Sequence, residues 1–244
     1  MGGNDGMTGE MDRMRAVQAL GWWLDSGVDV AIGEDPRDWR RPPSSAEHAP
    51  SSAPAATPEA RRATARPADL AAFRAWLASE TGLPLDRPGA RRVLPHGSEA
   101  APLMVLADFP SPQECAEGRP LAGESWVLAQ RMLAAIGIAP DSAYLATLAC
   151  FQAPGARFDH GDIERCASIA RDHVRLARPE RLLLFGDAPA RAMTGPPLAK
   201  ARDKVHRVEG VRTVATFHPR WLLQRPADKA LAWKDLLLLM SEEG

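Results

Sequence analysis

The chain has few cysteines, few aromatic residues and no long apolar run. Its 244 residues include three cysteines, Cys115, Cys150 and Cys166, and aromatic residues make up 6%. An odd number of cysteines without a CxxC spacing argues against a disulfide framework and favours a reducing compartment. Three thiolates are also too few for a four-cysteine zinc site or iron–sulfur cluster within one chain.

Signals for membranes and secretion are absent as well. No stretch of about 18 apolar residues is present, so we expect no membrane span and no membrane partner. Residues 1–12 contain neither a basic nor an apolar region, so we expect no secretory signal and a cytoplasmic protein. The 30 basic and 31 acidic residues nearly cancel. That balance excludes a polybasic surface but not a local basic groove.

Composition divides the chain into three parts. Residues 1–39 contain a helical apolar pattern and form an expected N-terminal helical arm. Residues 40–68 are rich in proline, alanine and serine, with six prolines, and predict an extended linker. Residues 69–244 are long enough for one globular domain.

Strand and helix signals alternate along this domain. Apolar runs of strand length lie at 103–106, 143–148, 181–186 and 211–217, and helical patterns lie at 69–79, 124–136, 162–177, 187–193 and near the C-terminus. Strands that are apolar on both faces and separated by helices are typical of a buried parallel sheet. We therefore predict an α/β fold, a three-layer α/β/α sandwich with a central four-stranded parallel sheet.

In such sheets, functional residues lie at the carboxyl ends of the strands. Asp108 follows the first strand and His218 follows the fourth. A neutral imidazole can donate a hydrogen bond to a developing anion, and a carboxylate can orient water or stabilise a cation. The plainer interpretation is that both residues cap the next turn or helix.

Two other groups of polar residues have weaker patterns. Asp159, His160 and Asp162 have irregular spacing and no fourth ligand, so we predict no metal site. A basic run holds Lys200, Arg202, Lys204 and Arg207, and such a run forms either a solvated face or a phosphate contact. The phosphate-binding motifs GxGxxG and GxxxxGK[ST] are absent.

Residues 102–240 resemble the uracil-DNA glycosylase superfamily, most closely its family 4. The matching blocks are LMVLADFPS at 103–111, GRPLAG at 118–123, PGAR at 154–157 and HPRWLL at 218–223. Residues 27–36 are similar to the arm of alphaproteobacterial members. The resemblance implies a DNA-repair protein that binds DNA as a monomer and associates with the bacterial nucleoid when bound.

The resemblance also assigns roles to residues. Asp108 and His218 would be catalytic, and Leu222 beside Trp221 would be an apolar wedge that enters the duplex. The base pocket would comprise Ala107, Phe109, Pro110, Leu121, Thr147 and Ala156. The DNA contacts would comprise Arg157, Lys200, Arg202, Lys204, Arg220, Trp221 and Leu222.

Departures from the family pattern fall on the residues that read the base. Leu121 replaces a stacking phenylalanine, and Thr147 and Ala156 stand where the family has asparagines. Such losses reduce base stacking and edge recognition. Leu83 stands where a cluster cysteine is expected, so we expect no cofactor and in particular no iron–sulfur cluster.

Three hypotheses follow from these residues. The chain is a DNA glycosylase of altered specificity that excises uracil or another deaminated base by hydrolysis of the N-glycosidic bond. Alternatively, it is a catalytically inactive relative that binds DNA or lesions, or a protein that docks a partner through its N-terminal arm, where Trp22 and Trp23 lie. The retained HPRWLL block favours the first two.

Overall fold

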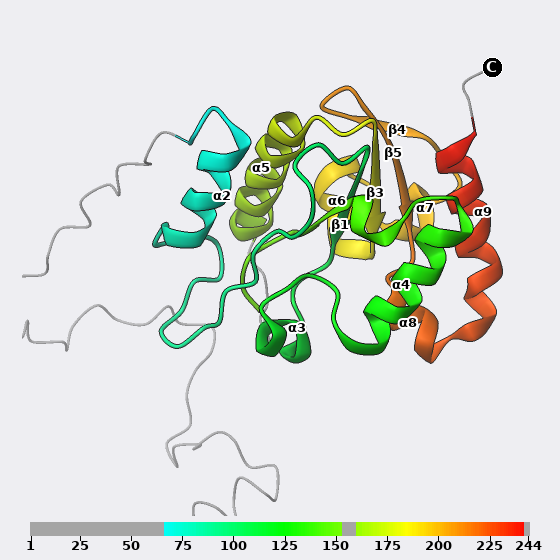
Figure 1. Ribbon diagram of the computed structural model, residues 1–244, viewed down its shortest axis with the longest axis horizontal. Coiled ribbons are helices and arrows are strands. Elements are labelled where there is room, and N and C mark those ends of the chain that lie inside the picture. The colour runs from blue at the N-terminus through cyan, green and yellow to red at the C-terminus, as the bar shows by residue number, and fades with distance from the viewer. Residues whose placement is uncertain (1–65, 153–159, 242–244) are drawn as a thin grey trace, which may run out of the picture. The chain divides into compact units, whose positions relative to one another are not determined.

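A five-stranded sheet forms the centre of the protein (Figure 1). The computed structural model describes residues 66–152 and 160–241, so the predicted arm and most of the linker lie outside the described residues. The strands are β1 (Leu103–Ala107), β2 (Ala143–Thr147), β3 (Arg181–Phe185), β4 (His206–Val208) and β5 (Val211–Thr216). Their order is β2-β1-β3-β5-β4, and all neighbours pair in parallel except β4 and β5. The four predicted parallel strands are confirmed, and β4 is an additional edge strand.

Helices cover both faces of this sheet. They are α2 (Leu70–Ser79), α3 (Pro112–Glu117), α4 (Gly123–Ala135), α5 (His160–Ala177), α6 (Asp187–Thr194), α7 (Leu198–Ala201), α8 (Pro219–Gln224) and α9 (Lys229–Met240). The five predicted helices are present within a few residues, whereas the short helices α3, α7 and α8 were not predicted. Within the described ranges, none is long and apolar enough to cross a membrane.

Successive residues of β1 point to two separate cores. Met104 and Leu106 pack with buried side chains of α2, α5, α6 and α7, while Leu103, Val105 and Ala107 pack with those of α4, α8 and α9. All five residues of β1 are buried, as expected for a strand covered on both sides. The predicted three-layer α/β/α architecture is therefore confirmed.

The edge strand β4 depends on a tight hairpin. Val208 pairs with Val211, and the two residues between them, Glu209 and Gly210, have φ angles of 49° and 81°. Positive φ at both central positions defines the type of two-residue turn that matches the twist of antiparallel strands. The sequence did not reveal β4 because only Val208 of its three residues is apolar, and Gly210 was the signal that could have revealed it.

The strand register brings the carboxyl ends of the parallel strands to one level. Ala107 pairs with both Thr147 and Phe185, and Phe185 pairs in turn with Thr216. The residues that follow these strands therefore leave the sheet side by side. Asp108, Gly186 and Phe217 are three of them, as expected for a site at this edge.

A buried carboxylate joins α9 to the sheet. Asp235 is 1% exposed and accepts hydrogen bonds from Arg202 Nε at 2.7 Å and Thr216 Oγ1 at 2.7 Å. The backbone N–H of Asp203 donates a third bond at 3.3 Å. Several charge-assisted bonds are what a buried carboxylate requires. The network fixes the end of β5 and the segment after α7 against α9.

His173 of α5 is buried against β2 beneath α2. Its Nε2 lies 2.8 Å from the Tyr144 hydroxyl, and the two rings meet edge to face with centroids 5.4 Å apart. Burial, together with the charge of Arg74, lowers the pKa of His173 from 6.5 to about 3. The ring is therefore neutral in the folded protein over the whole physiological range.

This burial predicts a pH-dependent stability. Between pH 6.5 and about 3 the unfolded chain binds a proton at His173 that the folded chain does not. The contribution of the neutral His173 ring to the free energy of unfolding should therefore be complete above pH 6.5. It should decrease as the pH drops through this window. His173→Gln, which retains a group able to bond Tyr144, should reduce the slope by about one proton, or about 1.4 kcal/mol per pH unit. Urea unfolding from pH 7 to pH 4 measures both slopes, and identical slopes in the two proteins would contradict the prediction.

Candidate active site at the carboxyl ends of the strands

An open cleft of about 660 Å³ lies where β1, β3 and β5 end. It is lined by Asp108, Gly186, Asp187, Leu198, Ala199, Arg202, Phe217, His218, Arg220, Trp221 and Gln224. These residues come from the loops after three neighbouring strands and from α7 and α8. The cleft therefore occupies the edge at which the strand pattern predicted a functional site.

His218 is held at the start of α8 in a defined tautomer. It is 6% exposed, and its Nδ1 accepts a hydrogen bond from the backbone N–H of Arg220 at 3.1 Å. Burial, and to a smaller extent the charge of Arg220, lowers the pKa of His218 to about 3. A neutral ring whose Nδ1 accepts a bond carries its proton on Nε2. His218 is thus both the helix cap of the plainer interpretation and a neutral N–H donor at the cleft.

Asp108 contributes a carboxyl group to the same cleft. Its Oδ1 accepts a hydrogen bond from the N–H of Phe109 at 2.8 Å. Contrary to the plainer interpretation, Asp108 does not cap α3, because Ser111 is the N-cap of that helix. Desolvation raises the pKa of Asp108, while the Phe109 N–H and the charge of Arg220 oppose that rise. Gly186 has a φ angle of 111°, and a Cβ atom there would lie 3.0 Å from Asp108 Oδ2, so a glycine is favoured where β3 ends.

Alternating cations and aromatic rings form one wall of the cleft. The Arg202 guanidinium lies 4.3 Å from the centroid of the Phe217 ring, and the Phe217 and Trp221 rings are nearly parallel, with centroids 6.5 Å apart. Arg225 lies 5.0 Å from the Trp221 centroid on the same helix end. This wall combines positive charge with flat apolar surface, a combination suited to nucleotides.

The structure brings together some of the residues that the sequence singled out. Asp108, His218, Arg202, Arg220 and Trp221 all line the cleft. Gly186, Phe217 and Gln224 also line it, and the sequence analysis did not assign them a role. Gly186 directly follows an apolar strand and Phe217 directly precedes His218, so position at a strand end was the signal available for both.

The residues assigned to a base pocket do not gather around the cleft. Leu121 is fully buried beneath α4, and its N–H donates to Glu114 Oε1 at 3.1 Å. Thr147 donates its hydroxyl proton to the Ala149 carbonyl at 2.8 Å and lines a different cavity. Ala107 and Pro110 are buried, and Phe109 packs against the core on the α5 side of the sheet. Ala156 and Arg157 lie outside the described residues.

The assignment of Leu222 as a wedge needs correction. Its side chain is 1% exposed and packs in the core formed with α4 and α9. An intercalating side chain must reach the surface, which Leu222 does not do. Its neighbours Trp221 and Leu223 are 41% and 38% exposed, so they carry the exposed apolar surface of this helix.

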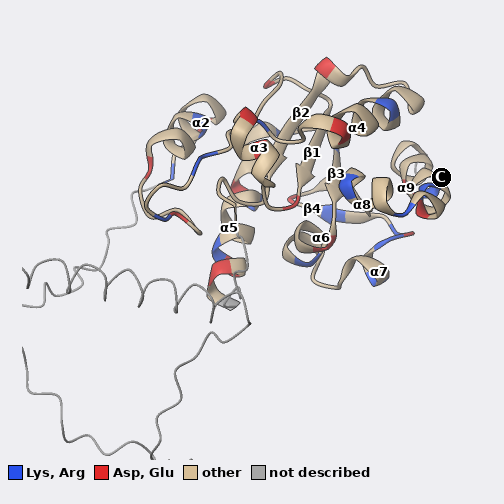
Figure 2. Cartoon of the chain, turned by 90° about the horizontal axis from the view of Figure 1, so that it is seen from below, with Lys and Arg blue, Asp and Glu red and all other residues tan. Residues whose placement is uncertain are grey.

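The basic run after α6 does not form a single face. Lys200 and Lys204 are exposed, but Arg202 is bound to the buried Asp235. Arg207 lies on β4 and lines a separate cleft near the amino ends of the strands. Lys and Arg residues are spread over several elements, as Figure 2 shows.

The comparison with known proteins agrees with this fold. The family model for the uracil DNA glycosylase superfamily matches residues 94–237. The chain therefore belongs to this superfamily, and the family-level prediction is confirmed. The matched range contains both Asp108 and His218, together with the strands that position them.

Two curated relatives show how similar the sequence is to known proteins. A type-4 uracil-DNA glycosylase of Archaeoglobus fulgidus is 24% identical over 141 residues, which cover 53% of this chain and 71% of that protein. A DNA polymerase of Bacillus phage SP01 is 24% identical over 148 residues, which cover 59% of this chain but only 16% of the polymerase. The first supports a family 4-like member, as predicted.

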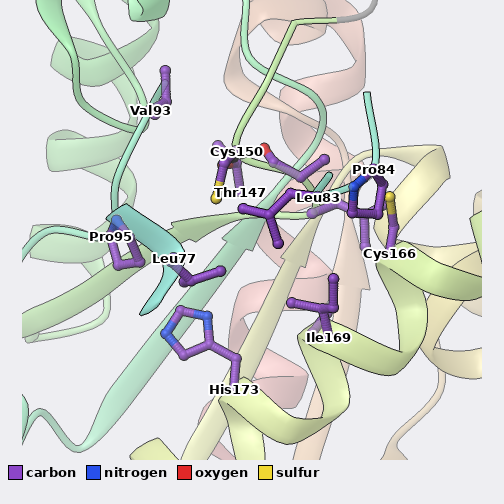
Figure 3. A pocket seen from close by; sticks show the side chains of 13 residues that line it. Leu77, Leu83, Pro84, Val93, Pro95, Thr147, Cys150, Cys166, Ile169 and His173 are labelled. Atoms are coloured by element: carbon purple, nitrogen blue, oxygen red, sulfur yellow. Dashed lines mark hydrogen bonds between the residues drawn. The ribbon is translucent and has the colours of Figure 1, made fainter. Parts of the chain in front are cut away.

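A second cavity lies between α5, β2 and the segment after α2. It measures only about 20 Å³, and its lining includes Leu83, Thr147, Cys150, Cys166 and His173 (Figure 3). Burial raises the pKa of both thiols to about 12. The two cysteines are therefore neutral, buried groups in an apolar setting, which is typical of unreactive structural cysteines.

The donors around this cavity do not fit a four-iron cluster. Such a cluster requires about four thiolates, whereas this cavity offers two thiols and has Leu83 at the position where the resemblance expects another. Among the described residues, no group of three or more His, Cys, Asp or Glu side chains could hold a metal ion. The third cysteine, Cys115, lines a different cleft. We therefore propose that apolar side chains have taken the place of the cluster.

This proposal predicts a colourless protein without stoichiometric iron. The full chain, purified without chelator, should show no visible absorption from a cluster, and a chelator should leave its melting temperature unchanged. Leu83→Ala should destabilise the fold by about 2–5 kcal/mol, because the buried leucine supports the packing. Iron analysis and thermal unfolding provide the test, and a brown protein with about four irons per chain would contradict it.

Proposed function

We propose that this chain is a DNA glycosylase that binds DNA and releases a deaminated base by hydrolysis of its N-glycosidic bond. One observation carries the proposal: a buried, neutral imidazole with its proton on Nε2 lines the same cleft as a carboxyl group. Membership of the uracil-DNA glycosylase superfamily supports the reaction class. The cation–aromatic wall supports nucleic acid as the partner.

The two polar groups suit the two charges that develop in this reaction. The water oxygen forms a bond to the sugar C1′ as the C–N bond breaks, and the electron pair of that bond leaves with the base. His218 Nε2–H donates a hydrogen bond to the departing base anion, a role that a neutral imidazole can perform at pH 7. Asp108, in its carboxylate form, stabilises the cationic sugar and accepts the proton of the water.

Among the described residues, the cleft lining does not contain the asparagine with which the family recognises the hydrogen-bonding edge of the base. The side chains with polar groups in the described lining are those of Asp108, Asp187, Arg202, His218, Arg220, Trp221 and Gln224, and Gln224 carries the amide among them. Thr147 already bonds the Ala149 carbonyl and does not face the cleft. We therefore propose uracil or another deaminated base, such as hypoxanthine or xanthine, as the released group.

A catalytically inactive DNA- or lesion-binding relative is the second candidate. It is favoured by Leu121, which stands in place of the stacking phenylalanine and is buried in the core, so it offers no stacking surface to a base. Release of free base from oligonucleotides that contain uracil, hypoxanthine or xanthine separates the two candidates. Release supports the glycosylase, whereas DNA binding without release supports the inactive relative. Docking through the N-terminal arm stays a prediction, because those residues lie outside the described ranges.

The role of His218 gives a quantitative prediction. His218→Ala should lower the rate of base release by roughly 10²–10³, the usual cost of removing one donor to a developing anion. Binding of the same oligonucleotide should change little, because this hydrogen bond strengthens only as the base leaves. Single-turnover release and fluorescence anisotropy measure the two effects.

A matched variant controls for the loss of a histidine. His96 is exposed, and its backbone pairs with Leu145 within the sheet rather than at the cleft. His96→Ala should therefore leave both base release and binding unchanged. Full base release by His218→Ala would refute the catalytic role of this histidine.

A further inference from the structure

The cleft that Cys115 lines is next to α3, the helix that follows the loop carrying Asp108. It measures about 480 Å³, and its lining includes Arg87 and Arg91 from the segment after α2. The lining also includes Pro112 and Cys115 of α3 and Gln152, which follows β2. No side chain in its described lining is acidic.

The side chains of the two arginines of this cleft have no competing partner among the residues that the structure describes. Both are exposed, and neither guanidinium makes a hydrogen bond or a salt bridge within the described ranges. Their neighbour Arg92 is different, since its guanidinium bonds the carbonyls of Leu77 and Glu80 at 2.6 and 2.9 Å. Arg87 and Arg91 are thus available to an external anion, whereas Arg92 is structural.

The nearby carboxylates are engaged elsewhere. Asp86 accepts from the Gly82 N–H at 3.1 Å and lies 3.9 Å from Arg92. Glu114 is buried and accepts from the backbone N–H groups of Ser111 and Leu121. The Glu117 carboxylate accepts from Gln113 at 3.3 Å. The cleft therefore keeps a local positive charge in a protein whose overall charge is nearly zero.

The strand order places this cleft in line with the active site. Gln152 follows β2 and α3 follows β1, while the active-site cleft lies where β1, β3 and β5 end. Figure 1 shows α3 and α8 at the same end of the sheet. Three interstrand spacings of about 4.8 Å separate β2 from β5, about 14 Å in all. Each strand of a duplex carries one phosphate per about 3.4 Å of helix axis, so a span of about 14 Å along the axis corresponds to about four nucleotides.

We propose that Arg87 and Arg91 bind phosphates of the DNA strand, on the side of the reacting nucleotide opposite to α8. The inference rests on the proposed function, because it assumes that DNA occupies the active-site cleft. Arg220 and Arg225 lie on one side of the reaction centre, and Arg87 and Arg91 extend the contact to the other. These contacts are independent of sequence, since they reach only the backbone.

A charge-removal experiment tests this surface. Arg87→Ala/Arg91→Ala in the full chain should weaken binding of a labelled single-stranded oligonucleotide and make the plot of log K against log salt less steep by about 1.4. That figure corresponds to two phosphates at about 0.7 each for single strands. At saturating oligonucleotide, base release should keep its rate, because neither arginine touches the reacting atoms.

A second pair of arginines provides the control. Arg175 and Arg178 line a cleft near the amino ends of the strands, where Glu180 and Glu209 also lie. Arg175→Ala/Arg178→Ala removes the same charge from the opposite edge and should leave affinity and salt slope unchanged. Circular dichroism verifies that both double variants are folded.

Cys115 offers an independent probe of the same cleft. Its thiol is partly exposed, whereas Cys150 and Cys166 are buried. The oligonucleotide should slow maleimide labelling of Cys115 in the unmutated protein, and inorganic phosphate at the same ionic strength should not. An unchanged salt slope in the Arg87→Ala/Arg91→Ala protein, with Cys115 unprotected, would overturn this inference and leave the proposed function standing. Absence of any DNA affinity at low salt would overturn both.

Discussion

In-register parallel pairing brings Ala107, Phe185 and Thr216 to the same level of the sheet, and the site depends on this alignment. Each strand ends where its neighbour ends, so Asp108, Gly186 and Phe217 leave the sheet together. Gly186 allows the closest approach, because any Cβ at that position would meet the Asp108 carboxyl at 3.0 Å. A shift of one residue in any of these strands would separate the carboxyl from the imidazole that follows Phe217.

Burial changes the pKa values of the polar groups at this edge of the sheet. Burial lowers the pKa of His218 to about 3, so its ring is neutral. Burial also raises the pKa of Asp108, but the Phe109 N–H and the charge of Arg220 oppose that rise. For the histidine the neutral form is an advantage, because a neutral ring donates from Nε2 without adding a buried charge. Behind the cleft, Asp235 holds Arg202 and Thr216 in place, so the wall formed by Arg202 and Phe217 has rigid support.

Much of the fold could be predicted because its determinants are local. The strands β1, β2 and β3 contain apolar runs, whereas β5 mixes apolar residues with an arginine and two threonines. Asp69 caps α2 as expected through a bond from the Ala72 N–H. Strand β4 was missed because it has three residues, of which only Val208 is apolar, and because its pairing depends on the hairpin at Glu209 and Gly210. The helices α3, α7 and α8 are too short for an apolar period to reveal them.

The site could be predicted only in part. Asp108 and His218 were found because strand ends can be read from the sequence, whereas the direction of each side chain depends on packing. Leu222 turns into the core between α4 and α9, and Thr147 bonds a neighbouring carbonyl. Arg87 and Arg91 were missed because they belong to an irregular segment, and only the folded chain brings it beside α3.

The central claim is that a buried, neutral imidazole faces the cleft at the end of β5. Heteronuclear NMR titration of the His218 ring tests this most directly, with assignment by comparison with His218→Gln. The account predicts that the His218 signals stay in the neutral form, with the proton on Nε2, from pH 8 down to pH 5, because the pKa is lowered to about 3. A His218 ring that titrates near its ordinary value of 6.5 would contradict the account.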